Sequence, residues 1–366
     1  MHVVRPALLS DIAALETLAA VTMPGVHTLP KTREKIAASV ERSIASFAAH
    51  VDIPSEESYL FVLEDGASGA LVGTAAIFAS AGSNGTYFSF RNDVIQQVSR
   101  DLNISHSVHA LTLCSELTGY SQLSSFYVRD RDSAGLAAAL LSRARLLFAV
   151  LAPHRFGDRF FVPLAGVTDA NGASPFWDAL GRKFFKMDFL DAEKVIGGAR
   201  NRSLIVELMP HYPVYVPLLP GDAQAVMGQI HPDGELAFKL LTAEGFEADD
   251  YIDLFDGGPI LQSHKYALRS FTGSVLRRVA LAKSEFEAES ESEADPDPGA
   301  CRAAPATYAI AAIAAIAAIA ASGEQNFRAI TVTCPAVESG EFVYLEQDAQ
   351  DALMVAPGDT VICART

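Results

Sequence analysis

The chain is poor in charged residues, and especially in basic ones. Only 20% of its 366 residues are charged, and 28 Lys and Arg stand against 44 Asp and Glu, which gives a net charge of −16. Nucleic-acid binding needs clustered Lys and Arg to neutralise phosphates, so we expect no nucleic-acid partner. Half of the residues are hydrophobic. That share excludes a disordered chain and predicts a large core, in a chain long enough for two or three domains.

Cysteine is scarce as well, and it occurs without pattern. Cys114, Cys301, Cys334 and Cys363 form no disulfide framework and no pair at metal-ligand spacing. His, Cys and carboxylate residues do not cluster at ligand spacing either, so the sequence predicts no metal. Reduced thiols indicate an intracellular protein. The N-terminal stretch MHVVRPALLSDIAALETLA lacks the basic and apolar regions of a signal peptide, and we therefore expect a cytoplasmic protein.

One apolar run, YAIAAIAAIAAIAA at 308–321, is too short for a membrane-spanning helix, which needs roughly 20 residues. We therefore expect no membrane association. Its Ile recurs every third residue, and this period drifts around a helix without making a stable apolar face. The preceding stretch, 285–299, is acidic and Ser/Pro-rich. The sequence thus predicts a low-complexity insertion over 283–325, and replacing 284–324 by a short Gly/Ser linker is expected to change stability and turnover very little.

Strand-like and helix-like segments alternate over the first 205 residues. Ser10 or Asp11 can cap the first helix, and Ser174 followed by Pro175 is typical of the start of another. The order predicts an α/β (α+β) fold for this part of the chain. Expected strands cover 3–5, 59–63, 71–78, 108–113, 123–128 and 160–164, and expected helices begin after Asp11 and cover 136–150 and 174–185.

A second unit follows, and the chain ends in a small β unit. The second unit is expected to contain strands at 204–208 and 251–255 and helices at 223–228 and 235–244. FRAITVTC and DTVICART, joined through a turn at 357–359, indicate the C-terminal β unit. The predicted division of the chain is therefore 1–205, 206–282, the insertion 283–325, and 326–366.

The segment LSSFYVRDRDSAGLAAALLSRAR, residues 123–145, carries the most informative local pattern. A strand leads into a loop with Gly135 and small Ala residues, and a helix follows. Backbone N–H groups at such a loop and helix N-terminus bind anions, and the pyrophosphate of coenzyme A is a natural ligand. Taken alone, the loop is more often an ordinary strand–loop–helix connection, because a short Gly-rich match is a weak signal. Its position after four strands, however, is similar to the GNAT acetyltransferase architecture.

In that architecture the strand before the loop splays away from its neighbour, and the acyl thioester lies in the gap. The resemblance implies that Phe126, Tyr127 and Val128 on the strand and Gly135 and Ala137 at the helix start contact the CoA donor. The strand around Phe126 can aim a backbone N–H at the thioester oxygen.

Longer segments resemble one family within that architecture. The chain is similar to the arginine N-succinyltransferases, and most similar to the alpha-type chains of the arginine/ornithine enzymes. The resemblance implies transfer of succinyl from succinyl-CoA to the α-amino group of arginine, and of ornithine, in arginine catabolism. It also implies a second GNAT-like half at 206–282 and a β-barrel-like C-terminal unit. The segments that carry it are EESYLFVLED (56–65), FSFRND (88–93), LTGYSQLSSFYV (117–128), SPFWDALGRKFF (174–185), ELMPHYPVYVPLLP (207–220), GQIHP (228–232) and DYIDLFDGGP (250–259).

The resemblance also implies roles for two residues. His231, in GQIHP, matches the proposed proton donor, and Phe126 matches a position that contacts succinyl-CoA. Thioester aminolysis needs a neutral amine, a polarised carbonyl and a protonated leaving thiolate, and histidine exchanges protons near neutrality. From its surroundings alone, a histidine before a proline is more often a structural residue at a helix end. Tyr127, Glu116 and the acidic cluster around Asp253 are the next candidates for proton transfer.

The acidic DGGP turn at 256–259 leaves two interpretations open. Asp253 and Asp256 either build a tight turn or bind the guanidinium of the substrate, because a planar cation favours bidentate carboxylates. The family often carries a glutamate or an arginine in the strand before the SPFW helix, whereas this chain has VPLAG at 162–166. A changed substrate preference is one consequence of that departure.

Two other functions compete with arginine succinylation. One is an N-acyltransferase for another amine or acyl donor; the other is a non-catalytic CoA-binding subunit of a heteromeric enzyme. We expect an oligomer in either case, including a hetero-oligomer with a homologous beta chain. Succinyl-CoA as the donor rests on the resemblance alone, because no residue in the sequence identifies itself as a partner of the succinyl carboxylate.

Overall fold

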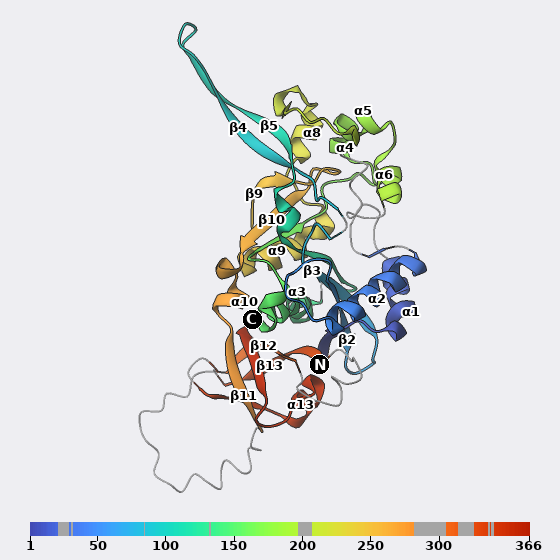
Figure 1. The fold of residues 1–366 in the computed structure, drawn as a ribbon, viewed down its shortest axis with the longest axis vertical. Helices are drawn as coiled ribbons and strands as arrows, with labels where there is room; N and C mark the ends of the chain where they lie inside the picture. The colour runs from blue at the N-terminus through green and yellow to red at the C-terminus, as the bar shows by residue number, and fades with distance from the viewer. Residues whose placement is uncertain are drawn as a thin grey trace.

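The structure is a computed structural model that describes residues 1–20, 29–30, 32–83, 85–131, 133–196, 207–281, 305–313, 326–335, 337 and 340–366. Across these ranges 15 strands form one continuous sheet, in the order β14-β11-β15-β12-β13-β1-β2-β3-β6-β7-β10-β9-β4-β5-β8. The molecule is elongated, with the β4–β5 hairpin projecting at one end and the C-terminal β unit at the other (Figure 1). The predicted α/β class is confirmed.

The N-terminal part of the sheet is covered on both faces. β1 (His2–Pro6), β2 (Ser58–Asp65) and β3 (Leu71–Phe78) pair antiparallel. Leu60 and Val62 of β2 pack with α1 (Ile12–Ala20) and α2 (Arg33–Ala48), whereas Tyr59 and Phe61 pack with α3 (Gly135–Leu151) on the opposite face. Because both faces are buried, the strand is a continuous apolar run and not an alternating one.

β6 (Ser121–Val128) and β7 (Arg159–Pro163) separate along their length. They pair in parallel only at Ser121 with Phe160 and at Gln122 with Phe161. Beyond those pairs β6 continues along β3, and β7 continues along β10 (Pro259–His264). The strand before the 129–134 loop is therefore splayed from its neighbour, as the GNAT-like architecture predicts, and the sheet has a gap near its middle.

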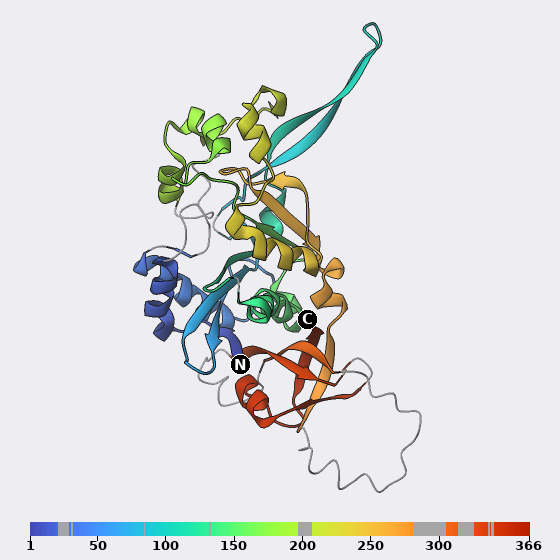
Figure 2. The ribbon, with the colours of Figure 1, turned by 180° about the vertical axis from the view of Figure 1, so that it is seen from behind.

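A long hairpin, β4 (Ser89–Ser99) and β5 (Ile104–Cys114), leaves the body of the molecule (Figures 1 and 2). Its base pairs with β9 (Glu247–Ile252) and β8 (Val214–Tyr215), so strands of the first predicted unit alternate with strands of the second. β4 has no apolar signal in the sequence, because its FRNDVIQQ stretch is mostly polar and its outer residues are partly or fully exposed.

Acid should loosen the base of this hairpin. Arg91 pairs with Asp93 (Nε–Oδ1 2.7 Å) and with Glu116, and the Tyr251 hydroxyl of β9 donates to Glu116. Arg91 lowers the pKa of Asp93, and the Tyr251 hydrogen bond followed by Arg91 lowers the pKa of Glu116. Depressed carboxyl pKa values contribute stability above the unfolded values, at about pH 4, which is lost as pH falls through the lower folded values.

We therefore expect hydrogen-exchange protection factors of the β4 and β5 amides near the body to fall as the pH is lowered below about 4, where these carboxylates become protonated. In Arg91→Gln, these protection factors should be lower than in the parent at neutral pH, and they should fall less when the pH is lowered. If protection falls equally with pH in Arg91→Gln and in the parent, the contacts of Arg91 do not stabilise the hairpin base.

The helix expected at 174–185 is two short helices. Ser174 caps α4 (Pro175–Ala179), with its Oγ accepting from the backbone N of Trp177 at 3.2 Å, as predicted. The chain breaks at Leu180 and α5 (Gly181–Phe185) follows. A Cβ at Gly181 would lie 2.2 Å from the Trp177 ring, so the indole packs directly against the glycine backbone. The break at Leu180 therefore separates two helices that the local pattern predicts as one.

Other second-unit elements lie near their expected positions. α9 (Glu235–Glu244) ends at Gly245 as predicted, and α8 (Gly221–Val226) begins two residues earlier than expected. The strand expected at 251–255 is β9, which begins and ends earlier. Residues 204–206 lie outside the described ranges, and residues 207–208 are helical and not the predicted strand. The remaining helices of this region are α6 (Phe189–Ile196) and α10 (Arg269–Thr272).

The prediction that 283–325 is a low-complexity insertion is wrong for the part of it that forms a strand of the C-terminal unit. Residues Ala306–Ile313, inside the 283–325 segment, form β12, which pairs with β13 (Phe327–Cys334) and β15 (Thr360–Arg365). β11 (Val275–Leu281), expected in the second unit, pairs with β15 and with β14 (Phe342–Leu345). The Ile repeat lacks a helical period, but a short strand buried on both faces needs no amphipathic pattern. α13 (Gln347–Leu353) packs on this unit.

Candidate active site

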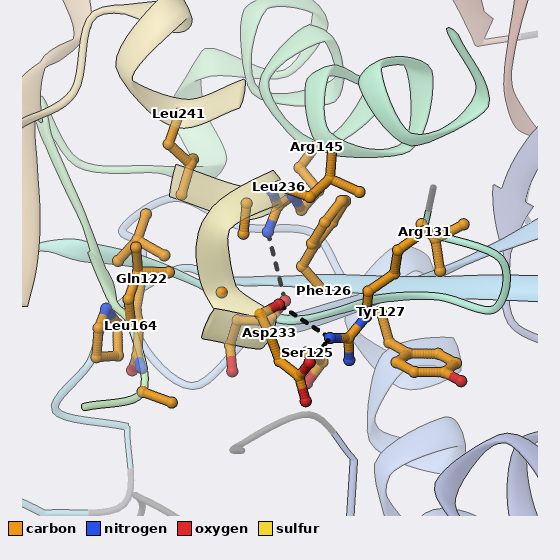
Figure 3. A pocket seen from close by; sticks show the side chains of 17 residues that line it. Gln122, Ser125, Phe126, Tyr127, Arg131, Arg145, Leu164, Asp233, Leu236 and Leu241 are labelled. Atoms are coloured by element: carbon orange, nitrogen blue, oxygen red, sulfur yellow. Dashed lines mark hydrogen bonds and ion pairs between the residues drawn. The ribbon is translucent and has the colours of Figure 1, made fainter. Parts of the chain in front are cut away.

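A pocket opens where β6 and β7 separate (Figure 3). One wall is β6, the opposite wall is the end of β7 with the residues after it, and α3 contributes Arg145. The start of α9 and the 3-10 turn before it, Pro232–Gly234, close a further side. The lining residues are Gln122, Ser124, Ser125, Phe126, Tyr127, Val128, Arg131, Arg145, Val162, Pro163, Leu164, Ala165, Asp233, Gly234, Leu236, Ala237 and Leu241.

A bulge in β6 shapes the first wall. Thr74 of β3 pairs with Tyr127 and Ala76 with Ser124, so two residues of β6 stand opposite one residue of β3. Ser125 has φ 54°, and its carbonyl accepts from Thr74 Oγ1 at 2.9 Å. A bulge takes residues out of the regular ladder and redirects them. It brings the sequence-predicted residues 126–128 to the gap, where they line the pocket together.

Gly135 and Ala137 are placed differently. They belong to the first turn of α3 and do not line the pocket between the strands. Ala134, which precedes the helix, supplies no side-chain cap, and nothing lies within 4 Å of a Cβ placed at Gly135. Ala137 N already donates to the Ala134 carbonyl at 2.7 Å, but no side chain caps this 17-residue helix, and an uncapped helix N-terminus is a place where phosphate binds.

His231 lies at the edge of the pocket. Its backbone N donates to the Ala165 carbonyl at 2.8 Å, and its Nδ1 accepts from the backbone N of Asp233 at 3.1 Å. Ala165 and Asp233 line the pocket, while the side chain of His231, 12% exposed, is outside the lining set. An accepting Nδ1 carries no proton, so the neutral ring carries its proton on Nε2. This hydrogen bond therefore holds the ring in one orientation, with Nδ1 occupied by the Asp233 N–H.

Three chain segments fix the wall next to His231. Leu164 N donates to the Pro259 carbonyl at 3.0 Å, Gly166 N donates to Asp256 Oδ2 at 2.8 Å, and Gly228 N donates to the Gly257 carbonyl at 2.8 Å. These bonds join 164–166, 228–231 and 256–259 into one cluster. The sequence did not predict this cluster, because its members are far apart in the chain.

The structure places Asp253 and Asp256 inside the protein, where they are 2% and 0% exposed. Asp253 Oδ1 accepts from Phe255 N, and Asp256 Oδ1 accepts from Gly258 N, both at 2.8 Å. Buried carboxylates that accept backbone N–H bonds hold a turn in shape. Of the two interpretations left open by the sequence, this geometry supports the tight turn, and neither carboxylate is exposed to a substrate guanidinium here.

Gly258→Ala should disturb this cluster. A Cβ at Gly258 would lie 2.2 Å from the Leu164 carbonyl and 2.5 Å from Gly166 N, both of them backbone atoms that cannot rotate away. We expect a loss of about 1–3 kcal/mol in the free energy of unfolding, and a lower turnover because Ala165 and His231 shift with the wall. Denaturant unfolding and steady-state turnover check the two effects.

Gly221→Ala is the matched control, since a Cβ there meets nothing within 4 Å and alanine favours a helix. That variant should be as stable as the parent or slightly more so. Equal stability of Gly258→Ala and the parent would contradict the close packing described.

Arg145 is a site residue that the sequence analysis missed. It is 1% exposed, lines the pocket, and its guanidinium lies 5.5 Å from the centre of the Phe126 ring. Burial lowers its pKa to about 9, which leaves it charged at neutral pH. A signal was available: Arg145 is four residues after Leu141, on the face of α3 that faces the core. Glu116, by contrast, is at the hairpin base with Arg91 and Tyr251 and does not line the pocket.

Within the described ranges, His, Cys, Asp and Glu side chains form no group of three that could hold a metal ion. In the same part of the chain, no helix combines the length and the apolar character needed to cross a membrane.

Comparisons with known proteins agree on one family. A family described as arginine N-succinyltransferase beta subunit matches residues 2–270. The alpha subunit of arginine N-succinyltransferase from Pseudomonas aeruginosa is 48% identical over 274 residues, covering 75% of this chain and 81% of the relative. The beta subunit from the same organism is 38% identical over 272 residues, covering 74% and 79%. The higher identity to the alpha chain agrees with the predicted resemblance.

Two further matches extend over nearly the whole chain. The arginine N-succinyltransferase of Yersinia enterocolitica is 32% identical over 358 residues, covering 98% of this chain and 96% of the relative. The solved structure of arginine/ornithine succinyltransferase subunit AI from Pseudomonas aeruginosa matches with a TM-score of 0.82 and 39% identity, covering 100% of this chain and 98% of that one. The chain belongs to the arginine N-succinyltransferase family.

Proposed function

We propose that this chain transfers the succinyl group of succinyl-CoA to the α-amino group of L-arginine, and also of ornithine, as a step of arginine catabolism. The observation that carries the proposal is the pocket between the splayed strands β6 and β7, in a chain of this family. The strongly negative net charge of −16 favours the approach of a cationic amino acid.

In this proposal the first turn of α3, with Gly135 and Ala137, binds the pyrophosphate of CoA. The pantetheine arm then runs into the gap, and the thioester lies beside Phe126, Tyr127 and Val128. A backbone N–H of the bulged strand polarises the thioester carbonyl, which develops negative charge when the amine attacks. A C–N bond forms and the C–S bond breaks. His231 Nε2 gives its proton to the leaving thiolate and takes up the proton that the attacking amine nitrogen releases, so the imidazole ends neutral and the protons balance.

We also propose that the enzyme is cytoplasmic and works as an oligomer. Relatives carry alpha and beta subunit names, and both are similar to this chain over about three quarters of its length. A homologous beta chain is therefore the partner that we expect.

The test is turnover by the purified chain, alone and mixed with a beta-type chain, using succinyl-CoA or acetyl-CoA with a panel of amines. Mass spectrometry should detect N-succinylarginine, and succinyl-CoA should be the better donor. Equal or faster turnover with acetyl-CoA would remove the donor assignment. No product from arginine under either condition would remove the proposed function and leave the non-catalytic subunit as its replacement.

A further inference from the structure

Arg145 carries a buried positive charge with neutral partners. Its side chain extends from α3 into the pocket, beside Phe126 (Figure 3). Nε donates to the Ser142 carbonyl at 3.2 Å, Nη2 donates to Ser142 Oγ at 3.1 Å, and Nη1 is 3.4 Å from the Ser124 carbonyl. The last of these contacts is long for a hydrogen bond. One edge of the guanidinium is therefore weakly satisfied and directed to the pocket.

Two neighbouring arginines, unlike Arg145, each contact a carboxylate. Arg131, also at the pocket, contacts Asp233 Oδ1 at 3.0 Å, and Arg143, on the same helix as Arg145, contacts Glu244 Oε2 at 3.2 Å. Among the residues that the structure describes, no carboxylate contacts Arg145, and burial alone accounts for its lowered pKa. A buried charge without a counter-ion costs several kcal/mol. An anionic group of a ligand in the pocket would offset that cost.

The position of Arg145 along α3 identifies which part of the donor lies near it. The residue is ten positions after Gly135, which places it about 15 Å along the helix axis from the first turn. In the proposed function, that turn binds the pyrophosphate and the acyl group lies at the far end of the pantetheine arm. Arg145 is therefore near the acyl end, where a succinyl group carries its free carboxylate.

We propose that Arg145 binds the terminal carboxylate of the succinyl group and so selects succinyl-CoA over acyl donors without a negative charge. The inference rests on the proposed function and adds a specificity residue to it. Arginine suits this role because its planar fork donates two parallel hydrogen bonds to a carboxylate and it stays charged when buried. The Phe126 ring, 5.5 Å away, supports the guanidinium plane from one side.

The experiment compares succinyl-CoA with butyryl-CoA, which has the same four-carbon chain with a methyl group in place of the carboxylate. Arg145→Met should lower kcat/KM for succinyl-CoA by about 10- to 150-fold, the range for a hydrogen bond to a charged group. Turnover of butyryl-CoA should stay unchanged or rise, which shows that the variant is folded. Arg143→Gln is the matched control on the same helix and outside the pocket, and its donor ratio should equal that of the parent.

Each other outcome has a defined meaning. If Arg145→Met keeps the parental ratio of succinyl-CoA to butyryl-CoA turnover, the proposal is wrong. If that ratio is kept while KM for arginine rises, Arg145 binds the carboxylate of the acceptor, which also overturns the proposal. If Arg145→Met does not fold, Arg145→Gln is judged by the same ratio. Failure of the parent chain to use succinyl-CoA would instead contradict the proposed function, before any variant is compared.

Discussion

Replacing residues 306–313 by a Gly/Ser segment of equal length should leave no stably folded C-terminal unit. These residues form β12, which pairs with β13 on one side and with β15 on the other. Tyr308 and Ile310 are buried in the core of the C-terminal unit, whereas Ala309 and Ala311 face the core under α3. β12 therefore joins the two cores, and its loss removes two rows of backbone hydrogen bonds and both buried faces.

The expected loss is large compared with the stability of a domain. Burial of Ile310 alone contributes about 1.5–3 kcal/mol, and a typical domain has about 5–15 kcal/mol of total stability. A sharper variant is Ile310→Asp, which buries an unpaired carboxylate in the same core. Both variants should lose the cooperative thermal transition of the parent, measured by circular dichroism.

Two controls distinguish the effect of losing β12 from the effect of changing residues near it. Thr307→Val changes a partly exposed residue of the same strand and should cost little. Replacing 285–299, the acidic part of the predicted insertion, should also have little effect, since that stretch is too polar to supply core. If the protein stays folded and active after replacement of 306–313, the segment is dispensable, as the sequence predicted, and the role given to β12 is wrong.

The case of β12 shows what local patterns cannot provide. The strand sequence ATYAIAAI at 306–313 has no helical period, and its burial depends on β13 and β15, which lie later in the chain. β2 and β3, by contrast, were predictable because apolar β-rich runs bounded by turn residues specify strands locally. The helices show the same difference. α9 ends at the glycine that the sequence predicts, whereas no local signal in 174–185 predicts the break at Leu180 between α4 and α5.

The site divides in the same way. Residues 126–128 and the start of α3 follow from a strand–loop–helix pattern and the order of strands before it. The placement of His231 beside Ala165 depends on contacts between 164–166, 228–231 and 256–259, which no local pattern specifies. Arg145 was overlooked because an arginine among alanines and leucines on a helix is ordinarily a surface residue. Its place four residues after Leu141 indicates the core-facing side of α3, but that spacing does not show that a charged side chain there is buried in the pocket.

His231→Ala should lower the turnover number by about 10²- to 10⁴-fold, which is the usual contribution of a general acid–base group. The expected reason is the lost donation from Nε2 to the leaving thiolate. Nδ1 is already occupied by the N–H of Asp233, so the ring is held in one tautomer and orientation. Affinity for CoA should change little, because the proposed pyrophosphate site at Gly135 is on a different element.

A structural role for His231 predicts a different result. The residue caps the turn Pro232–Gly234 and its backbone is bonded to Ala165, so its loss could act through folding alone. Turnover is therefore normalised to the folded fraction, and His231→Asn is included because its side chain can still accept from the Asp233 N–H without exchanging protons near neutrality. The exposed His211 provides a matched control, and His211→Ala should behave as the parent.

The two explanations separate on three measurements. A proton-transfer role predicts slow turnover in both His231→Ala and His231→Asn, a changed dependence of rate on pH, and partial recovery of the alanine variant by added imidazole. A capping role predicts parental turnover for His231→Asn. It also predicts that each folded molecule of His231→Ala turns over as fast as the parent. Turnover within a few-fold of the parent in both variants, with an unchanged pH profile, would exclude His231 and direct the search to Tyr127, which lines the pocket, before Glu116, which does not.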